Sequence, residues 1–268
     1  PYLQDMPIHH AEKVHTEEEI LMIVKYCIND VRSTKKILHL SKPLITVRRK
    51  IKEKYGLECY NYSNTKIGSQ LLLGLYCEAT NQKKYDVKQL RTYRNGIKIK
   101  DILFDYISFQ TPPFQQFLKK LKEKTIYNTK SDFKYKLRFK GYEFHYGAGG
   151  IHQCIKPGKY LAEGDIIIKD LDVASLYPSI ACMNNMSPAH LGDEFFQVYK
   201  NDIVDVRLAE KKKPKANRDI AIIEGFKEAA NATYGNSNSE YSWLYDSKYT
   251  MQTTINGQLL LSMLVEDL

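Results

Sequence analysis

The stretch that decides the fold reads GDIIIKDLDVASLYPS and covers residues 164–179. Its first half is rich in β-branched residues and follows Gly164, which is typical of a strand over residues 164–171. Asp172 ends this run, and Pro178 stands where it fits the first turn of a helix. The pattern therefore predicts a strand, a turn that carries an aspartate, and a helix.

Asp172 is a candidate metal ligand because of its place after an apolar strand. Mg²⁺ demands near-octahedral geometry, so its carboxylate ligands need rigid backbone. Phosphoryl transfer with two metal ions uses carboxylates held in this way. The structural alternative is that Asp172 only caps the helix that follows.

A second stretch with chemical character is KEAANATYG, residues 227–235. Lys227, Asn231 and Tyr234 are spaced by four and three residues, so one helix face carries all of them. A lysine on such a face can neutralise the charge of a phosphate. The structural alternative is an exposed amphipathic helix that ends at Gly235.

Composition limits the class of protein. Forty Lys and Arg residues against 31 Asp and Glu give a net charge of +9, which suits a polyanionic partner such as nucleic acid. The five cysteines lack paired spacing, which argues against disulfides or a zinc site and predicts reduced thiols in the cytoplasm. No apolar run has transmembrane length, so no membrane partner is expected. Because the chain begins with Pro1, we expect a processed or fragmentary polypeptide.

Periodicity predicts the remaining elements. A helix is expected from residue 17 to 38, with Thr16 and Glu19 as a capping box and an apolar stripe on one face. Other helices are expected around residues 68–77, over 114–124, and on both sides of a basic turn at 213–219, the second over 220–232. Strands are expected over residues 133–139 and 142–146, and residues 250–268 alternate before they become helical. The boundary between domains is expected near residues 130–150.

The two chemical stretches, in this order, resemble the family B DNA polymerases, and most closely their phage and plasmid-type members. The first palm motif of that family, DxxSLYPS, is matched by Asp172, Ser175, Leu176, Tyr177, Pro178 and Ser179. The fingers motif, KxxxNSxYG, is matched by Lys227, Asn231, Tyr234 and Gly235, with Ala232 in place of the usual Ser.

Three weaker matches follow the same order along the chain. Tyr26 and Asp30 are similar to the exonuclease motif YxxxD, although this spacing on a helix usually reflects surface packing. Tyr146, Gly149 and Gly150 resemble the YxGG segment with one extra residue. Thr254, Gly257 and Gln258 resemble the primer-template motif TxxGR, with Gln in place of Arg. An ordinary turn is the alternative for both glycine sites.

The resemblance implies a role for each matched residue. Asp172, Tyr177 and Lys227 would be catalytic, and Tyr177 would exclude a ribose 2′-hydroxyl. Asp172 and the Val173 carbonyl would hold two Mg²⁺ ions, with Mn²⁺ as an alternative, and Asp30 would hold the exonuclease metal beside Tyr26. The dNTP would contact Val173, Ser175, Leu176, Tyr177, Arg207, Lys211, Lys227, Asn231 and Tyr234. DNA would contact Gly149, Gly150, Gly235, Thr254, Gly257 and Gln258. For Lys211 to Lys215 a solvated basic tip is the alternative.

The resemblance also implies an architecture and a function. The fold class is α+β: residues 1–135 would be the C-terminal part of an RNase H-like 3′–5′ exonuclease domain with its connector, and residues 136–268 a partial palm with an antiparallel sheet and short helical fingers at about 195–235. The intact protein would perform template-directed DNA synthesis with proofreading in a host cytoplasm. Its partners would be primer-template DNA, dNTPs and the rest of the polymerase chain.

One expected motif is missing. The family's YxDTD motif, which supplies a second catalytic aspartate, does not occur in the sequence. We therefore expect the isolated polypeptide to lack polymerase and exonuclease activity, since one carboxylate is a poor two-metal site. The competing interpretations are a non-catalytic DNA-binding module and a polymerase that uses or makes RNA.

Overall fold

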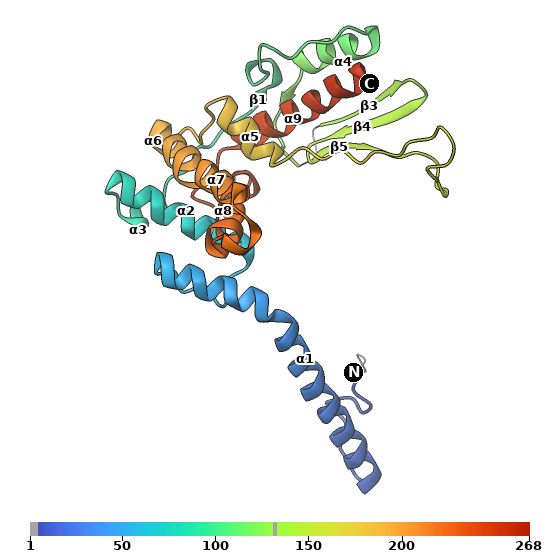
Figure 1. Ribbon diagram of the computed structural model, residues 1–268, viewed down its shortest axis with the longest axis vertical. Coiled ribbons are helices and arrows are strands. Elements are labelled where there is room, and N and C mark those ends of the chain that lie inside the picture. Colours follow the sequence, from blue (N-terminus) through green and yellow to red (C-terminus); the bar gives the residue numbers. More distant parts are fainter. Residues whose placement is uncertain (1–4, 131–132) are drawn as a thin grey trace. The chain divides into compact units, whose positions relative to one another are not determined.

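The computed structural model describes residues 5–130 and 133–268 (Figure 1). The chain forms two compact units, Pro1–Asn61 and Tyr62–Leu268. The boundary expected near residues 130–150 lies inside the second unit.

The first unit consists mainly of helix α1 (Glu17–Tyr55). The expected capping box is confirmed: the Thr16 hydroxyl accepts from the Glu19 amide, and the Glu19 carboxylate accepts from the Thr16 amide. The helix runs beyond the expected residue 38 and stops at Gly56, whose φ of 64° is the left-handed conformation that glycine adopts without strain. The predicted apolar stripe of this helix is exposed, as at Val31.

Helices make up one part of the second unit. They are α2 (Asn64–Thr80), α3 (Lys84–Val87), α6 (Gly192–Gln197), the π-helix Val198–Asp205, α7 (Val206–Lys212), the π-helix Ala221–Gly225 and α8 (Phe226–Asn236). Helices α2 and α8 pack very closely at Gly68, because a Cβ there would lie 2.2 Å from the Glu228 carbonyl oxygen. The Tyr76 ring packs against Phe195 and Trp243, at centroid distances of 5.9 and 6.1 Å, and these two rings also contact each other.

The other part of the second unit is a mixed core. Strands β1 (Ile97–Lys98) and β2 (Thr125–Ile126) pair antiparallel, as do β3 (Lys134–Phe139), β4 (Tyr142–Gly147) and β5 (Gly150–Gln153) in the order β3-β4-β5. A 3-10 turn, Ile99–Asp101, follows β1. Helices α4 (Pro112–Lys122) and α9 (Ser247–Asp267) lie beside the strands of the β3-β4-β5 sheet (Figure 1). Their apolar faces are buried in the same core as β3 and β4. Its members include Phe114, Phe117, Leu137, Phe144, Met251, Ile255 and Leu259.

The strand predicted over residues 164–171 is wrong. Residues 154–173 form neither strand nor helix, and Ile167 keeps 75% of its surface exposed. A strand needs a neighbour to pair its N–H and C=O groups. In the described ranges the ladders join only β1 with β2 and β3 with β4 and β5, so the β-branched run has no such neighbour.

The alternation predicted at the start of residues 250–268 is also wrong, because α9 is helical throughout. The hydroxyl of Thr253 donates to the Tyr249 carbonyl at 2.8 Å, and that of Thr254 to the Thr250 carbonyl at 2.9 Å. Such bonds within the helix let polar side chains lie buried, so the hydrophobic pattern no longer shows the helical period.

The structure confirms the coarse fold class, a mixture of helices with small antiparallel sheets. The helices expected near residues 68–77, 114–124 and 220–232, and the strands expected over 133–139 and 142–146, are present within a few residues of their predicted limits. Across the described ranges, no helix combines the length and the apolar character needed to span a membrane.

Candidate functional site

Helix α5 (Leu176–Met183) carries the matched palm-type residues. It begins at Ser175, which is the N-cap and has a left-handed φ of 53°, so Asp172 does not cap the helix and the capping alternative is wrong. The Ser179 hydroxyl donates to the Ala174 carbonyl at 3.3 Å and closes the turn. The predicted sequence of turn and helix start is therefore confirmed, with Pro178 buried in the first turn.

Tyr177 of α5 lies against Tyr234 of α8, with ring centroids 4.1 Å apart. This contact joins two segments that are far apart in the sequence. Burial raises the pKa of Tyr177 to about 12, and the neighbouring Tyr234 adds to the effect. The Tyr177 phenol therefore keeps its proton at neutral pH.

Helix α9 contributes to the same place. The Tyr234 hydroxyl and the Thr254 Oγ1 are 3.0 Å apart. A Cβ on Gly257 would lie 3.3 Å from Ile180 Cδ1 and at ordinary contact distance, 3.5 Å, from Tyr177 Cε1, so Gly257 packs directly against α5. We call Tyr177, Tyr234, Thr254 and Gly257 the motif cluster, because residues of three matched segments meet in it.

The glycine turn between β4 and β5 lies next to the motif cluster. Gly149, Tyr234 and Gly235 line a pocket of about 340 Å³, which we call the glycine-turn pocket. Gly150 pairs with Gly147 across the turn, so the ordinary-turn interpretation describes its backbone correctly. A fourth matched segment thus reaches the same neighbourhood.

Gln258 links α9 to this turn. Its Nε2 donates to the Gly147 carbonyl at 2.8 Å, and the residue is 4% exposed. The amide therefore fixes the position of the turn from inside the fold. Its predicted contact with a DNA phosphate stays a prediction.

Helix α8 presents the predicted face. Lys227 and Asn231 are exposed, Tyr234 is half-buried, and all belong to one continuous helix. Gly235 does not end that helix, which continues to Asn236 and is followed by Ser237 as its C-cap. The C-cap alternative for this glycine is therefore wrong.

The two predicted cations of helix α7 differ in environment. The Arg207 Nε donates to the Ile223 carbonyl at 3.0 Å, and partial burial lowers the pKa of this guanidinium. Lys211 is exposed near the tip, where its carbonyl accepts from Arg218 at 2.6 Å. The environment of Lys211 thus matches the solvated-tip alternative, and its contact with a triphosphate stays a prediction.

Asp172 and Val173 lie on exposed backbone ahead of α5. Val173 borders an apolar pocket of about 310 Å³, together with Leu176, Ile180 and Met183. Nowhere in the described part of the chain do three His, Cys, Asp or Glu side chains gather in a group that could hold a metal ion. Asp172 therefore lies outside any such group among the described residues.

Tyr26 and Asp30 belong to the first unit, one turn apart on α1. The hydrogen bond to Asp30 raises the pKa of the Tyr26 phenol. This pairing is the surface packing expected of such a spacing, and the exonuclease role stays a prediction.

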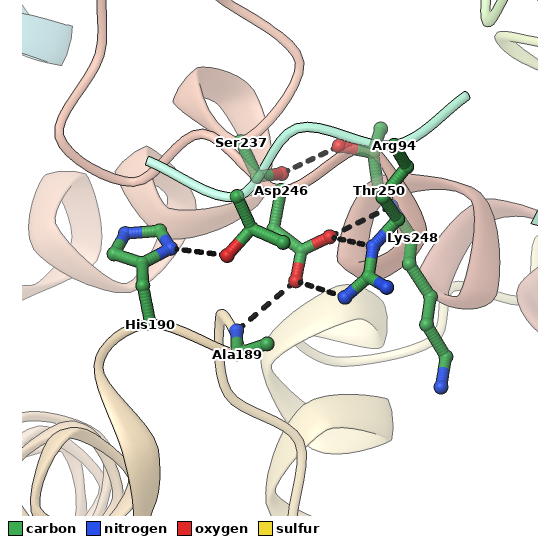
Figure 2. A network of polar contacts seen from close by, with 8 residues as sticks. Arg94, Ala189, His190, Ser237, Asp246, Lys248 and Thr250 are labelled. Atoms are coloured by element: carbon green, nitrogen blue, oxygen red, sulfur yellow. Dashed lines mark hydrogen bonds and ion pairs between the residues drawn. The ribbon is translucent and has the colours of Figure 1, made fainter. Parts of the chain in front are cut away.

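The sequence did not point to Asp246, which is 2% exposed and lies in a buried polar network (Figure 2). Its carboxylate accepts from Arg94 Nε at 2.8 Å, from Arg94 Nη2 at 3.1 Å and from the Ala189 amide at 3.0 Å. Burial alone would raise the pKa of Asp246, but Arg94 and the backbone amides outweigh it and lower the pKa. Its place before Ser247 is a helix-cap signal, whereas no local pattern indicates Arg94.

His190 belongs to the same network (Figure 2). Its Nε2 lies 2.8 Å from the Trp243 carbonyl, and its Nδ1 lies 2.8 Å from the Thr92 hydroxyl. A carbonyl can only accept, so Nε2 carries the proton and Thr92 donates to Nδ1. This arrangement favours the neutral imidazole and ties residues around 92, 190 and 243 together.

Comparison with known proteins identifies no relative: no family model, no curated protein and no solved structure matches the chain. The motif cluster and its surroundings therefore carry the functional argument through their own geometry.

Proposed function

We propose that this chain carries the nucleotide-binding part of a DNA-directed DNA polymerase of the family B type. The observation that supports the proposal most is the contact of Tyr177 with Tyr234 at 4.1 Å. Their further contacts with Thr254 and Gly257 bring three matched segments together, although nothing in the sequence requires them to be neighbours.

The motif cluster has the chemistry of a nucleotide site. A sugar that lies on the Tyr177 ring would meet a wall where a ribose carries its 2′-hydroxyl, which separates DNA from RNA precursors. Lys227 and Asn231 are exposed on the helix that carries Tyr234, so a triphosphate on this face would meet an ammonium group. Tyr177 would act as the sugar filter and Lys227 as the phosphate ligand.

The glycine-turn pocket has properties that suit a DNA backbone. Gly149 carries no side chain beside Tyr234, so a strand can approach the polypeptide closely. The chain's net charge of +9 favours a polyanion, because binding releases counterions from the phosphates. Within the proposal, Gly150, Gly235, Thr254 and Gln258 position this surface.

The residues present near Asp172 do not fit a pair of catalytic metal ions. Two Mg²⁺ ions, when bound, would supply Lewis acids for the primer hydroxyl and the triphosphate. Asp172 with the Val173 carbonyl provides too little negative charge for two such ions. DNA synthesis is therefore proposed only for a protein in which a second carboxylate joins Asp172. The palm and exonuclease assignments, proofreading by Tyr26 and Asp30, and a cytoplasmic location belong to the same proposal.

The test uses the 268-residue chain. Binding of a fluorescent dATP analogue with Mg²⁺ should weaken about tenfold in Lys227→Ala, because a charge-assisted phosphate contact is lost. Lys119→Ala, on the exposed face of α4, removes the same charge away from the cluster and should change binding less than about twofold. Equal losses in both variants would mean that nonspecific charge, and not this face, holds the nucleotide.

A non-catalytic DNA-binding module is the second candidate, and the exposed position of Asp172 on irregular backbone favours it. Primer extension by the complete protein with Asp172→Ala separates the two. Lost extension with retained DNA binding supports the polymerase, whereas unchanged function supports the module. If Tyr177 filters sugars, Tyr177→Ala should raise ribonucleotide incorporation in the same assay.

A further inference from the structure

A third pocket, of about 570 Å³, lies in the second unit, and we call it the Tyr127 pocket. Its walls are the chain around Arg94, the segment after β2 and the loop between α8 and α9. Its lining includes Arg94, Tyr127, Asn128, Lys130, Asn238 and Tyr241. None of the motif matches falls on these residues.

The Tyr127 pocket adjoins the glycine-turn pocket. Thr129, Lys130 and Asn238 line both of them. At this boundary the Thr129 hydroxyl donates to Asn238 Oδ1 at 2.6 Å. A surface formed by two adjoining pockets fits an extended ligand better than a compact one.

Two aromatic rings stand at the surface of the Tyr127 pocket. Tyr241 is 93% exposed and Tyr127 is 78% exposed. Tyrosine rings in such positions offer flat faces on which nucleic-acid bases stack, and stacking tolerates any base sequence.

Gly96 lies beside the first ring, and the backbone that carries the second ring is held by Arg91. A Cβ on Gly96 would lie 3.1 Å from Tyr127 Cε1, so the glycine leaves room for that ring. Arg91 donates to the carbonyls of Glu240 at 3.0 Å and Tyr241 at 3.1 Å, which fixes the loop under the second ring. Ordered backbone lowers the entropy cost of binding.

The charges of the Tyr127 pocket favour contact with bases over a cluster of phosphates. Arg94 is engaged by Asp246, and Glu240 contributes a carboxylate to the lining, so Lys130 is the cation best placed for a phosphate. The Lys130 amide donates to Asn128 Oδ1 at 2.9 Å, which orders this wall. Carboxamides such as Asn128 and Asn238 can hydrogen-bond the edges of unpaired bases.

We propose that the Tyr127 pocket binds single-stranded nucleic acid through its bases, which stack on Tyr127 and Tyr241. The path onward to the glycine-turn pocket rests on the proposed function, whereas the stacking rings do not depend on it. Unpaired bases are required, because in a duplex the base faces are already covered by their neighbours.

The experiment measures fluorescence polarisation of labelled dT12 with the whole chain. Replacing both tyrosines by alanine (Tyr127→Ala with Tyr241→Ala) should weaken binding about tenfold or more, since each stacked base contributes substantially. The matching double phenylalanine variant keeps the rings and should bind within about twofold of the wild type. Tyr85→Ala removes an equally exposed tyrosine, 75% accessible on α3, and should have no effect.

The proposal is overturned if the wild type does not bind dT12 or if the double alanine variant binds it as well as the wild type. It is also overturned if the double phenylalanine variant loses as much affinity for dT12 as the double alanine variant. A U12 probe shows whether RNA or DNA is preferred, and the double alanine variant should lose affinity for whichever binds. An oligonucleotide with 5-iodouracil should crosslink to Tyr127 or Tyr241, and crosslinks confined to other segments would also overturn the proposal.

The two proposals fail in different ways. Lys227→Ala should weaken binding of the dATP analogue and leave dT12 binding unchanged. If the chain binds no dNTP while the double alanine variant still loses dT12, the polymerase proposal fails and the strand site stands. If instead the chain binds dNTP and the double alanine variant keeps its affinity for dT12, the single-strand proposal fails and the polymerase proposal stands.

Discussion

Two neighbouring parts of the second unit differ in how the N–H and C=O groups of their backbones are hydrogen-bonded. Helix α5 forms its own hydrogen bonds and buries Ile180 near α9, whereas residues 154–173 form neither helix nor strand and expose Ile167. A helix completes its backbone bonds within one segment, while a strand depends on another. Local sequence can therefore specify α5 in this chain, but it cannot by itself order the β-branched run before it.

The largest effect should come from a buried charge compared with an exposed one. Asp246→Ala leaves Arg94 without its partner inside the network and should lower the free energy of unfolding by about 3 kcal/mol. Asp172→Ala, in the exposed segment, should change it by less than about 0.5 kcal/mol. Urea unfolding followed by the fluorescence of Trp243, the single tryptophan, gives both values. Similar losses would show that the exposed segment is packed in solution.

The difference in the free energy of unfolding should be slightly smaller between alanine variants of two isoleucines, Ile180 and Ile167. Ile180 is 3% exposed on α5, so Ile180→Ala should cost about 2 to 3 kcal/mol through lost burial and a cavity. Ile167→Ala should cost less than about 0.5 kcal/mol, because that side chain lies in solvent. If Ile167→Ala lowered the free energy of unfolding by more than about 1 kcal/mol in the same urea experiment, residues 164–171 would have to form a paired strand after all.

The glycine pair tests close packing. Gly68→Ala should cost about 2 kcal/mol, because its Cβ would lie 2.2 Å from a backbone oxygen of α8 and the two helices would have to separate. Gly158→Ala, where the nearest atoms belong to Tyr160 at 3.5 Å, should be neutral. Thermal melts of the two variants provide the measurement, and equal melting temperatures would contradict the close contact of α2 with α8.

The smallest expected effect is the loss of stability at acid pH that His190 causes. Burial, with a contribution from Arg91, lowers the pKa of His190 in the folded chain. As pH falls below about 6.5, the unfolded chain takes up a proton that the folded chain resists, so stability should decrease by at most about 1.4 kcal/mol per pH unit. Unfolding at pH 7 and pH 5 should show this decrease in the wild type and less of it in His190→Gln. His152→Gln, at an exposed position on β5, should retain the wild-type dependence.

Features with a local cause could be predicted from the sequence. The Thr16–Glu19 capping box, the helix face of Lys227, Asn231 and Tyr234, and the start of α5 all depend on residues within a few positions of one another. Their physical causes, capping and helical periodicity, are visible in a short window.

Features that depend on distant partners could not be predicted. Arg94 meets Asp246 across 152 positions, and Gly68 meets Glu228 from another helix. The resemblance to a family assigns Tyr177 and Tyr234 to one nucleotide, but neither it nor either segment alone predicts that their rings meet. The run at residues 164–171 shows the opposite error, because its strand propensity indicates an element for which the described chain offers no partner strand.

Ser175 has a consequence for engineering the chain. A residue with a Cβ in the left-handed conformation is strained by about 1 kcal/mol relative to glycine. Ser175→Gly should therefore relieve backbone strain at this position. The natural sequence instead places a hydroxyl immediately before the helix that carries Tyr177. A variant selected only for thermal stability would be expected to lose this serine, which makes position 175 a place where stability and function can be separated.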